Sequence, residues 1–387
     1  MLSRADAGSG SSPRLERIRM IKRTPFGTAP DGQPVTVYEL AAGSVRVRIM
    51  DFGATIVGID TPDASGNVKD IVLGFGSLEG YFDNPAGYGA TIGPSANRTD
   101  KGEVPIAGTV YQLAKNDGPT KENNLHTDLA HGLHKRVWKA NADEGANQVT
   151  FTYQLEDGEL GLPGNRTFTA SYRLTDAAEA AAADAENAPV LTLSYCCDTD
   201  VETFVNMTNH VYFNLAGHDS GTVRDQLACV HAEHFLPLRE DSVSTGEVRT
   251  VAGTPFDFRA AKTIGAQIDE DDEQLKRARG YDHCFCVDGY ESDASPRPAL
   301  TATDPASGRT LSIDITAPGA HLYTGNWLGD ENAKDGASYT PNDGFAFEPE
   351  FWPDNVHHED WEHPVCTPEH PWTSTIVYRF SAATAKN

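Results

Sequence analysis

Two short stretches carry the residue types that proton transfer needs. The run TNHVYFNL places His210 in a segment with the alternation of a strand, and the run FEPEFWPD places Glu348 directly before Pro349, where the strand ladder must end. Histidine titrates near neutral pH and glutamate accepts a proton, so the two can work as an acid and base pair. On residue type alone, His210 can equally be a hydrogen-bonded core histidine and Glu348 an edge carboxylate.

Three further clusters place polar side chains among apolar runs. They are SANRTDKG, with Asn97 and Arg98, the long run ENNLHTDLAHGLHKRVW, with His126, and YDHCF, with Asp282. An arginine offers several donors and an aspartate several acceptors, which suits a ligand rich in hydroxyl groups. An ordinary salt bridge or solvated turn would use the same residues.

The histidines of the run ENNLHTDLAHGLHKRVW do not have the spacing of a known metal site. His126, His131 and His134 give the spacing H-x4-H-x2-H, which matches neither a structural zinc site nor the HExxH motif. Lys135 and Arg136 follow immediately, and their positive charges disfavour a cation. The sequence therefore predicts no bound metal.

The elements that must position these residues are mostly strands. Short alternating or β-branched runs recur between clusters of Gly, Pro, Asn and Asp, for example TVYEL, VRVRIM, DIVLGF, QVTFTYQL, FTASYRL, VLTLSY, TFVNMTNHVYFNL, TLSIDI, FAFEPEF and TIVYRF. This spacing predicts an all-β sandwich or barrel. The best helix signal is residues 268–280, with Gly280 as its C-cap, and the Ala- and acid-rich residues 175–189 predict a surface insertion.

Composition limits the class of partner. The chain has 387 residues and a net charge of −25, which disfavours nucleic acid and anionic membranes. The six cysteines show no CxxC spacing, and the first 20 residues lack the apolar run of a signal peptide. We expect a cytoplasmic protein, a monomer or weak homodimer, with a disordered tail over residues 1–20 and one domain over residues 21–387.

Many motifs, in order along the chain, resemble those of the aldose 1-epimerase (galactose mutarotase) family. They include FGATIVGI, GPSANRTDKG, NNLH, LHKRVW, DGELGLPGN, TNHVYFNLAGH, STGEVRTVAGTPFDFR, GYDHCF, PGAHLYTGNWL and FEPEFWPD. The resemblance extends from about Pro25 to Phe380. It implies a large antiparallel β-supersandwich with few short helices, an open sugar-binding cleft and no cofactor.

The resemblance also implies roles for individual residues. His210 matches the family's general acid and Glu348 its general base, and they would act on α and β anomers of free aldohexoses such as glucose and galactose by opening and closing the ring. The residues that match sugar contacts, or that lie on the same cleft, are Asn97, Arg98, His126, Tyr212, Asp282 and His321. We expect the acid and base on opposite sides of one pyranose ring.

This chain departs from the family pattern at the site. Glu350 and His321 each stand where the family usually has Gln, and the added carboxylate would raise the pKa of Glu348 or compete for hydroxyls. The segment after His126 is one residue longer, which leaves His131 as an alternative for the first histidine position. Two other functions remain open: a glycoside hydrolase that uses Asp282 with Glu348, and a sugar-binding protein without catalysis.

Overall fold

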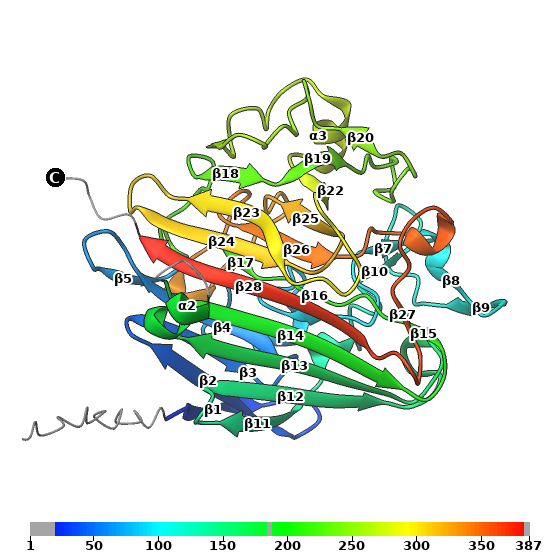
Figure 1. Ribbon diagram of the computed structural model, residues 1–387, viewed down its shortest axis with the longest axis horizontal. Helices are drawn as coiled ribbons and strands as arrows, with labels where there is room; N and C mark the ends of the chain where they lie inside the picture. Colours follow the sequence, from blue (N-terminus) through cyan, green and yellow to red (C-terminus); the bar gives the residue numbers. More distant parts are fainter. Residues whose placement is uncertain (1–19, 184–187, 383–387) are drawn as a thin grey trace, which may run out of the picture.

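Residues 20–183 and 188–382 are described by the computed structural model, and they form mainly antiparallel strands. The largest sheet has nine strands (Figure 1), in the order β11 (Lys139–Asp143), β12 (Gln148–Leu155), β13 (Arg166–Thr175), β14 (Val190–Thr199), β28 (Trp372–Ala382), β24 (Arg309–Ile315), β23 (Arg297–Thr303), β18 (Leu227–Val230) and β21 (Lys262–Thr263). Its long strands alternate between buried and partly exposed residues, as expected when one face of a sheet packs on a core.

Two further sheets pack against this one. The five-stranded sheet contains β1 (Lys22–Thr28), β2 (Pro34–Ala42), β3 (Val45–Met50), β4 (Thr55–Pro62) and β5 (Val68–Asp70). The six-stranded sheet contains, in order, β17 (Tyr212–Phe213), β26 (Phe345–Glu350), β25 (Gly319–Tyr323), β22 (Asp282–Val287), β19 (Ala232–Phe235) and β20 (Arg249–Thr250). One continuous apolar core joins all three sheets, with Phe213 of the six-stranded sheet 5.9 Å from Tyr378 of β28 between ring centroids.

Four small ribbons complete the strand pairing. They are β16 (Thr208–Asn209) with β6 (Thr91–Ile92), β10 (Asn124–Leu125) with β7 (Arg98–Thr99), β8 (Glu103–Ile106) with β9 (Thr109–Gln112), and β15 (Thr203–Phe204) with β27 (Val365–Cys366). Every strand pair in the described residues is antiparallel. The all-β sandwich is therefore confirmed.

Helices are few and short in the described chain, as expected. They are α1 (Gly80–Asp83), α2 (Ala177–Ala183), α3 (Glu273–Ala278) and the 3-10 turns Asp100–Gly102, Leu133–Lys135, Glu159–Gly161, Lys334–Gly336 and Asn355–His357. Within these residues no helix is both long and apolar enough to cross a membrane. The Ala-rich segment, predicted as a surface insertion, does contain a helix, α2, although residues 184–187 lie outside the described residues.

Three predictions about local structure need correction. The helix expected over residues 268–280 is only α3, because Asp272 caps its first turn with hydrogen bonds to two backbone N–H groups and Arg279, rather than Gly280, takes the left-handed conformation that ends it. The run DIVLGF is mostly outside any strand, and only Asp70 belongs to β5. The run at residues 203–215 is broken into β15, β16 and β17. Of the predicted tail only Met20 is described, and it is exposed.

Candidate active site

One face of the six-stranded sheet forms the floor of the candidate site. In the strand register, His321 of β25 lies directly opposite Glu348 of β26 and opposite Cys284 of β22, while Tyr323 lies opposite Asp282. Side chains two residues apart share a face of a strand, so polar groups from three adjacent strands gather on this side. The opposite side carries apolar residues that enter the core, including Phe347 and Leu322.

A cavity of about 550 Å³ opens above this floor. All eight side chains predicted from the sequence line it: Asn97, Arg98, His126, His210, Tyr212, Asp282, His321 and Glu348. They come from segments far apart in the chain, and the strand pairing brings them together. The cavity is also lined by residues that the sequence analysis did not single out, among them Tyr323, Trp327 and Asp330.

The proposed acid and base contact each other at the bottom of the cavity. Nε2 of His210 lies 3.4 Å from Oε1 of Glu348, and both side chains are almost fully buried. No pyranose ring fits between groups this close, so the expectation of opposite sides was wrong. The anomeric hydroxyl and the ring oxygen are both bonded to the same carbon, and two adjacent groups can therefore reach them from one side.

Burial controls the proton affinity of this pair. It lowers the pKa of His210 to about 4 and raises the pKa of Glu348 well above its usual range, because neither charged form is solvated in the cavity. The expectation that His210 titrates near neutral pH therefore does not describe the empty site. Both shifts favour the neutral forms, the imidazole of His210 and the carboxylic acid of Glu348.

The backbone around His210 fixes its ring. His210 follows β16 instead of lying in a strand, and its backbone N–H donates to the carbonyl of Ala90 while its own carbonyl accepts from the N–H of Gly89. The ring of Tyr212 stacks on the His210 ring with centroids 5.0 Å apart and planes 22° apart. On a nearby loop, a Cβ at Gly87 would come within 3.4 Å of the imidazole, so this position, with φ of +70°, suits glycine.

His126 is held as a hydrogen-bond donor. The backbone N–H of Asn97 donates to Nδ1 of His126 over 3.1 Å, and the N–H of His126 returns a bond to the carbonyl of Asn97. Because Nδ1 accepts, the proton of the neutral ring lies on Nε2. Burial lowers the pKa of His126 well below its usual range, so this ring stays neutral. His131 is exposed and pairs with Asp128, so His126 rather than His131 lines the cavity.

The position of the proton on the His126 ring also decides whether this site suits a metal ion. Ligand atoms of His126, His210 and Glu348 all lie within 4.8 Å of one another, as a metal site would require. However, a histidine binds a metal through a nitrogen lone pair, and Nδ1 of His126 already accepts a hydrogen bond while Nε2 carries the proton. Only two donors then remain, fewer than the three protein ligands typical of a catalytic zinc site. The residues present therefore do not fit a tightly held metal.

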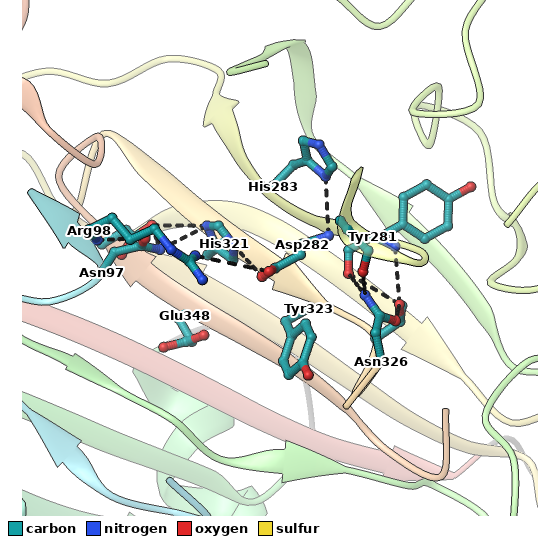
Figure 2. Close-up of polar contacts among 12 residues, drawn as sticks. Asn97, Arg98, Tyr281, Asp282, His283, His321, Tyr323, Asn326 and Glu348 are labelled. Atoms are coloured by element: carbon teal, nitrogen blue, oxygen red, sulfur yellow. Dashed lines mark hydrogen bonds and ion pairs between the residues drawn. The ribbon is translucent and has the colours of Figure 1, made fainter. Parts of the chain in front are cut away.

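Arg98 and Asp282 form the predicted pair of donor and acceptor groups. Arg98 donates from Nε to Asp117 over 2.7 Å, and its Nη1 lies 4.0 Å from Asp282 (Figure 2). Asp117 was not predicted, because nothing in its sequence neighbourhood distinguishes it from other turn aspartates. Its contact holds one edge of the guanidinium of Arg98, a side chain that lines the cavity.

The two departures from the family pattern contact each other. Nε2 of His321 lies 2.8 Å from Oδ1 of Asp282 (Figure 2). On the other side of the ring, Nδ1 of His321 lies 3.3 Å from Oε1 of Glu350. Glu350 does not line the cavity, so it does not compete for hydroxyls as one expectation held. Burial raises the pKa of Glu348 most, and the charge of His321 lowers it. Glu350 has a smaller effect than either, but it does raise the pKa of Glu348, as the other expectation held.

The fold and this cavity together bring a buried histidine–glutamate pair next to side chains with several hydrogen-bond donors and acceptors, an arrangement that suits acid–base chemistry on a carbohydrate. Comparisons with known proteins give the same class. The family model described as aldose 1-epimerase matches residues 36–379, and the chain belongs to the aldose 1-epimerase family.

Relatives cover nearly the whole chain. A galactose mutarotase from Bos taurus is 34% identical over 365 residues, which are 94% of this chain and 99% of the relative, and an aldose 1-epimerase from Escherichia coli is 35% identical over 367 residues, which are 94% and 100%. The crystal structure of a galactose 1-epimerase from Lactobacillus acidophilus superimposes with a TM-score of 0.78 at 25% identity, covering 94% of this chain and 99% of the other. The family and fold expected from the sequence motifs are therefore confirmed.

Proposed function

We propose that the protein interconverts the α and β anomers of free aldohexoses, with Glu348 and His210 as the proton carriers. The observation that carries this proposal is the contact of 3.4 Å between the two side chains inside one cavity lined by hydroxyl-binding groups. The names of the relatives point to the same reaction. Free glucose and galactose are the substrates that we would test first.

The reaction follows from one proton shared by the pair. With that proton on His210, Glu348 is an anion and accepts the proton of the anomeric hydroxyl, while His210 donates to the ring oxygen. The bond between the anomeric carbon and the ring oxygen breaks, and an open-chain aldehyde forms. Rotation about the adjacent carbon–carbon bond exposes the other carbonyl face, and the two transfers then run backwards.

Burial assists the opening step. The transfers convert a charged pair, imidazolium and carboxylate, into a neutral pair, imidazole and carboxylic acid. A buried site of low dielectric favours the neutral pair, as the pKa shifts of both groups indicate. The open-chain state therefore coincides with the protonation state that the cavity stabilises.

The remaining cavity residues hold the sugar. Arg98 and Asp282 contact hydroxyl groups, and the Nε2–H of His126 donates to the ring oxygen or a neighbouring hydroxyl without transferring its proton. Fixing the ring in this way shortens both proton paths. Asn97 supports this arrangement through its backbone bonds to His126.

A glycoside hydrolase is less well supported. Asp282 would be its nucleophile, but Oδ1 of Asp282 accepts a hydrogen bond from His321 and its other oxygen faces Arg98. Both oxygens are therefore engaged by cations. A sugar-binding protein without catalysis would need no acid next to a base, and this cavity has both.

Polarimetry tests the proposal. Freshly dissolved α-glucose and α-galactose should approach optical equilibrium faster with the purified protein than without it, and nitrophenyl glycosides should remain intact. Release of nitrophenol, or sugar binding with no change in the mutarotation rate, would contradict the proposal. We further propose that the protein acts in the cytoplasm, which agrees with its six free cysteines. We also propose that it is a monomer or weak homodimer.

A further inference from the structure

Along the cavity floor, three ionisable side chains form a continuous buried chain. The Asp282–His321–Glu350 chain runs from β22 through β25 to β26, with contacts of 2.8 Å and 3.3 Å on the two sides of the imidazole. The side chains of His321 and Glu350 are 3% and 0% exposed. Asp282 and His321 line the cavity, whereas Glu350 lies one layer deeper.

We infer that Glu350 is a positioning residue that acts with Asp282 to hold His321 as an imidazolium, and that this cation orients Asp282 for sugar binding and sets the proton affinity of the His210–Glu348 pair. The inference rests on the proposed function and adds to it a residue that never touches the sugar. It begins from the geometry of the chain. An imidazole bonded through both nitrogens to carboxylates can satisfy both only when each nitrogen carries a hydrogen, which is the charged form.

The hydrogen-bond partners of Glu350 support this arrangement. The side-chain amide of Asn97 donates to Oε1 of Glu350 over 3.1 Å and leaves that oxygen as an acceptor toward His321 as well. The amide nitrogen of Asn97 also lies 3.0 Å from Nδ1 of His321, and because an amide nitrogen only donates, it bonds to Nδ1 only when that nitrogen carries no hydrogen. When Nδ1 does carry a hydrogen, the N–H groups of Asn97 and His321 both donate to Oε1 of Glu350, which favours the ionised form of Glu350.

The surrounding charges agree with a cation at this position. The carboxylates that act on His321 are those of Asp282 and Glu350, with Glu348 directly opposite on β26, and the nearest other cation is Arg98. The groups around it without a fixed charge are the imidazoles of His126, His210 and His283, the thiol of Cys284 and the phenol of Tyr323. Burial alone would lower the pKa of His321, but the hydrogen bonds to Asp282 and Glu350 raise it to about 10.

The chain acts on both the binding group and the reacting pair. Donation from His321 to Oδ1 keeps Asp282 ionised, and the pKa of Asp282 falls to about 2 although burial opposes this. The positive charge on His321 lowers the pKa of Glu348 and of His210, and the negative charge on Glu350 raises the pKa of Glu348. The two charges therefore act on Glu348 with opposite signs.

Because His321 and Glu350 shift the pKa of Glu348 in opposite directions, single and double variants of these two residues test the inference. In Glu350→Gln the contact with Asp282 still holds His321 as a cation, so the variant loses only a negative charge and the pH profile of kcat/KM should move to lower pH by about one unit. His321→Gln removes a positive charge, so the profile should move to higher pH by a similar amount. The double variant should return to within about half a unit of the wild type and be less destabilised than the sum of the single variants. Asp70→Asn is the matched control, because Asp70 is also a buried carboxylate between two cations, Arg48 and Lys334, but does not line the cavity.

The control should lower the melting temperature without moving the profile. If the Asp282–His321–Glu350 chain had only a structural role, its variants would behave like this control. Glu350→Gln and His321→Gln would then change stability and leave the pH profile of kcat/KM unmoved, and that result overturns the inference. Shifts of the same sign for both single variants would also overturn it.

A second measurement does not depend on activity. In ¹⁵N NMR of the wild type, with His321→Gln used for assignment, the His321 ring should give the signal of an imidazolium from pH 6 to pH 8. A neutral ring in this range overturns the inference, even if the mutarotation rate is high. Conversely, a charged ring in a protein without mutarotase activity would contradict the proposed function alone.

Discussion

His210 and Glu348 lie 3.4 Å apart, nitrogen to oxygen, which is too close for a water molecule to fit between these two atoms. They therefore titrate as one unit, and the number of protons on the pair decides whether it can act. One proton gives an acid and a base. Two protons leave no base, and none leaves no acid.

The pH dependence of kcat/KM should be a broad plateau with two limbs. Activity should fall below about pH 4, where His210 gains a proton while Glu348 still holds its own, because burial lowers the pKa of His210 to about 4. It should also fall on the alkaline side, where Glu348 loses its proton at a pKa that burial raises. Initial mutarotation rates across a pH series, corrected for the uncatalysed reaction, measure this. A single acidic limb near pH 6.5 would contradict a coupled pair.

Glu348→Gln should remove the accelerated mutarotation and leave sugar binding largely intact. The amide has the same shape but cannot accept the anomeric proton, and general-base catalysis is worth about 100- to 10,000-fold. Polarimetry gives the rate, and calorimetric titration with galactose gives the affinity. A variant with a rate near that of the wild type would exclude Glu348 from the mechanism.

Two of the histidines that line the cavity, His126 and His210, should respond differently to the same substitution. His126→Gln keeps an N–H donor near the position of Nε2, so activity should fall by no more than about tenfold, because His126 donates a hydrogen bond without transferring its proton. His210→Gln removes a proton carrier and should lower kcat by about 100-fold or more while KM changes little. Steady-state polarimetry on both variants compares them directly, and equal losses would contradict the assignment of separate roles.

Stability should decline at alkaline pH through His321. Its pKa in the folded protein is about 10, above the ordinary value of 6.5, so its contribution to the free energy of unfolding is complete below pH 6.5 and is lost as the pH rises through about 10. Thermal melts of the wild type should therefore show a lower melting temperature at pH 10 than at pH 7. The double variant His321→Gln/Glu350→Gln lacks this titration, and its melting temperature should fall by less over the same range.

Much of the site could be predicted from the sequence because strand alternation is local. The alternation in FAFEPEF places Glu348 and Glu350 on one face, and the structure has them on the same side of β26. Tyr212 likewise shares the cavity with His210, two residues earlier. The polar residues that interrupt apolar runs were the residues that line the cavity, because burial of such groups requires partners.

What could not be predicted depends on register between strands. Nothing in the sequence shows that β25 lies between β22 and β26, and only this order places His321 within reach of both Asp282 and Glu350. The proton affinities were also missed. The pKa of His210 falls to about 4 because its side chain is buried away from water. Residue type alone does not show how deeply a side chain is buried.

The cavity has two parts of different origin. Its floor comes from hydrogen-bonded strands whose reverse side is anchored in the core, and shifting β26 by a single residue would turn Glu348 inward and bring Phe347 to the sugar. Its rim comes from loop residues such as Pro85, Trp327 and Asp330. Loops tolerate insertions and substitutions far better than hydrogen-bonded strands do. Preference among aldoses can therefore diverge at the rim while the proton chemistry below is inherited unchanged.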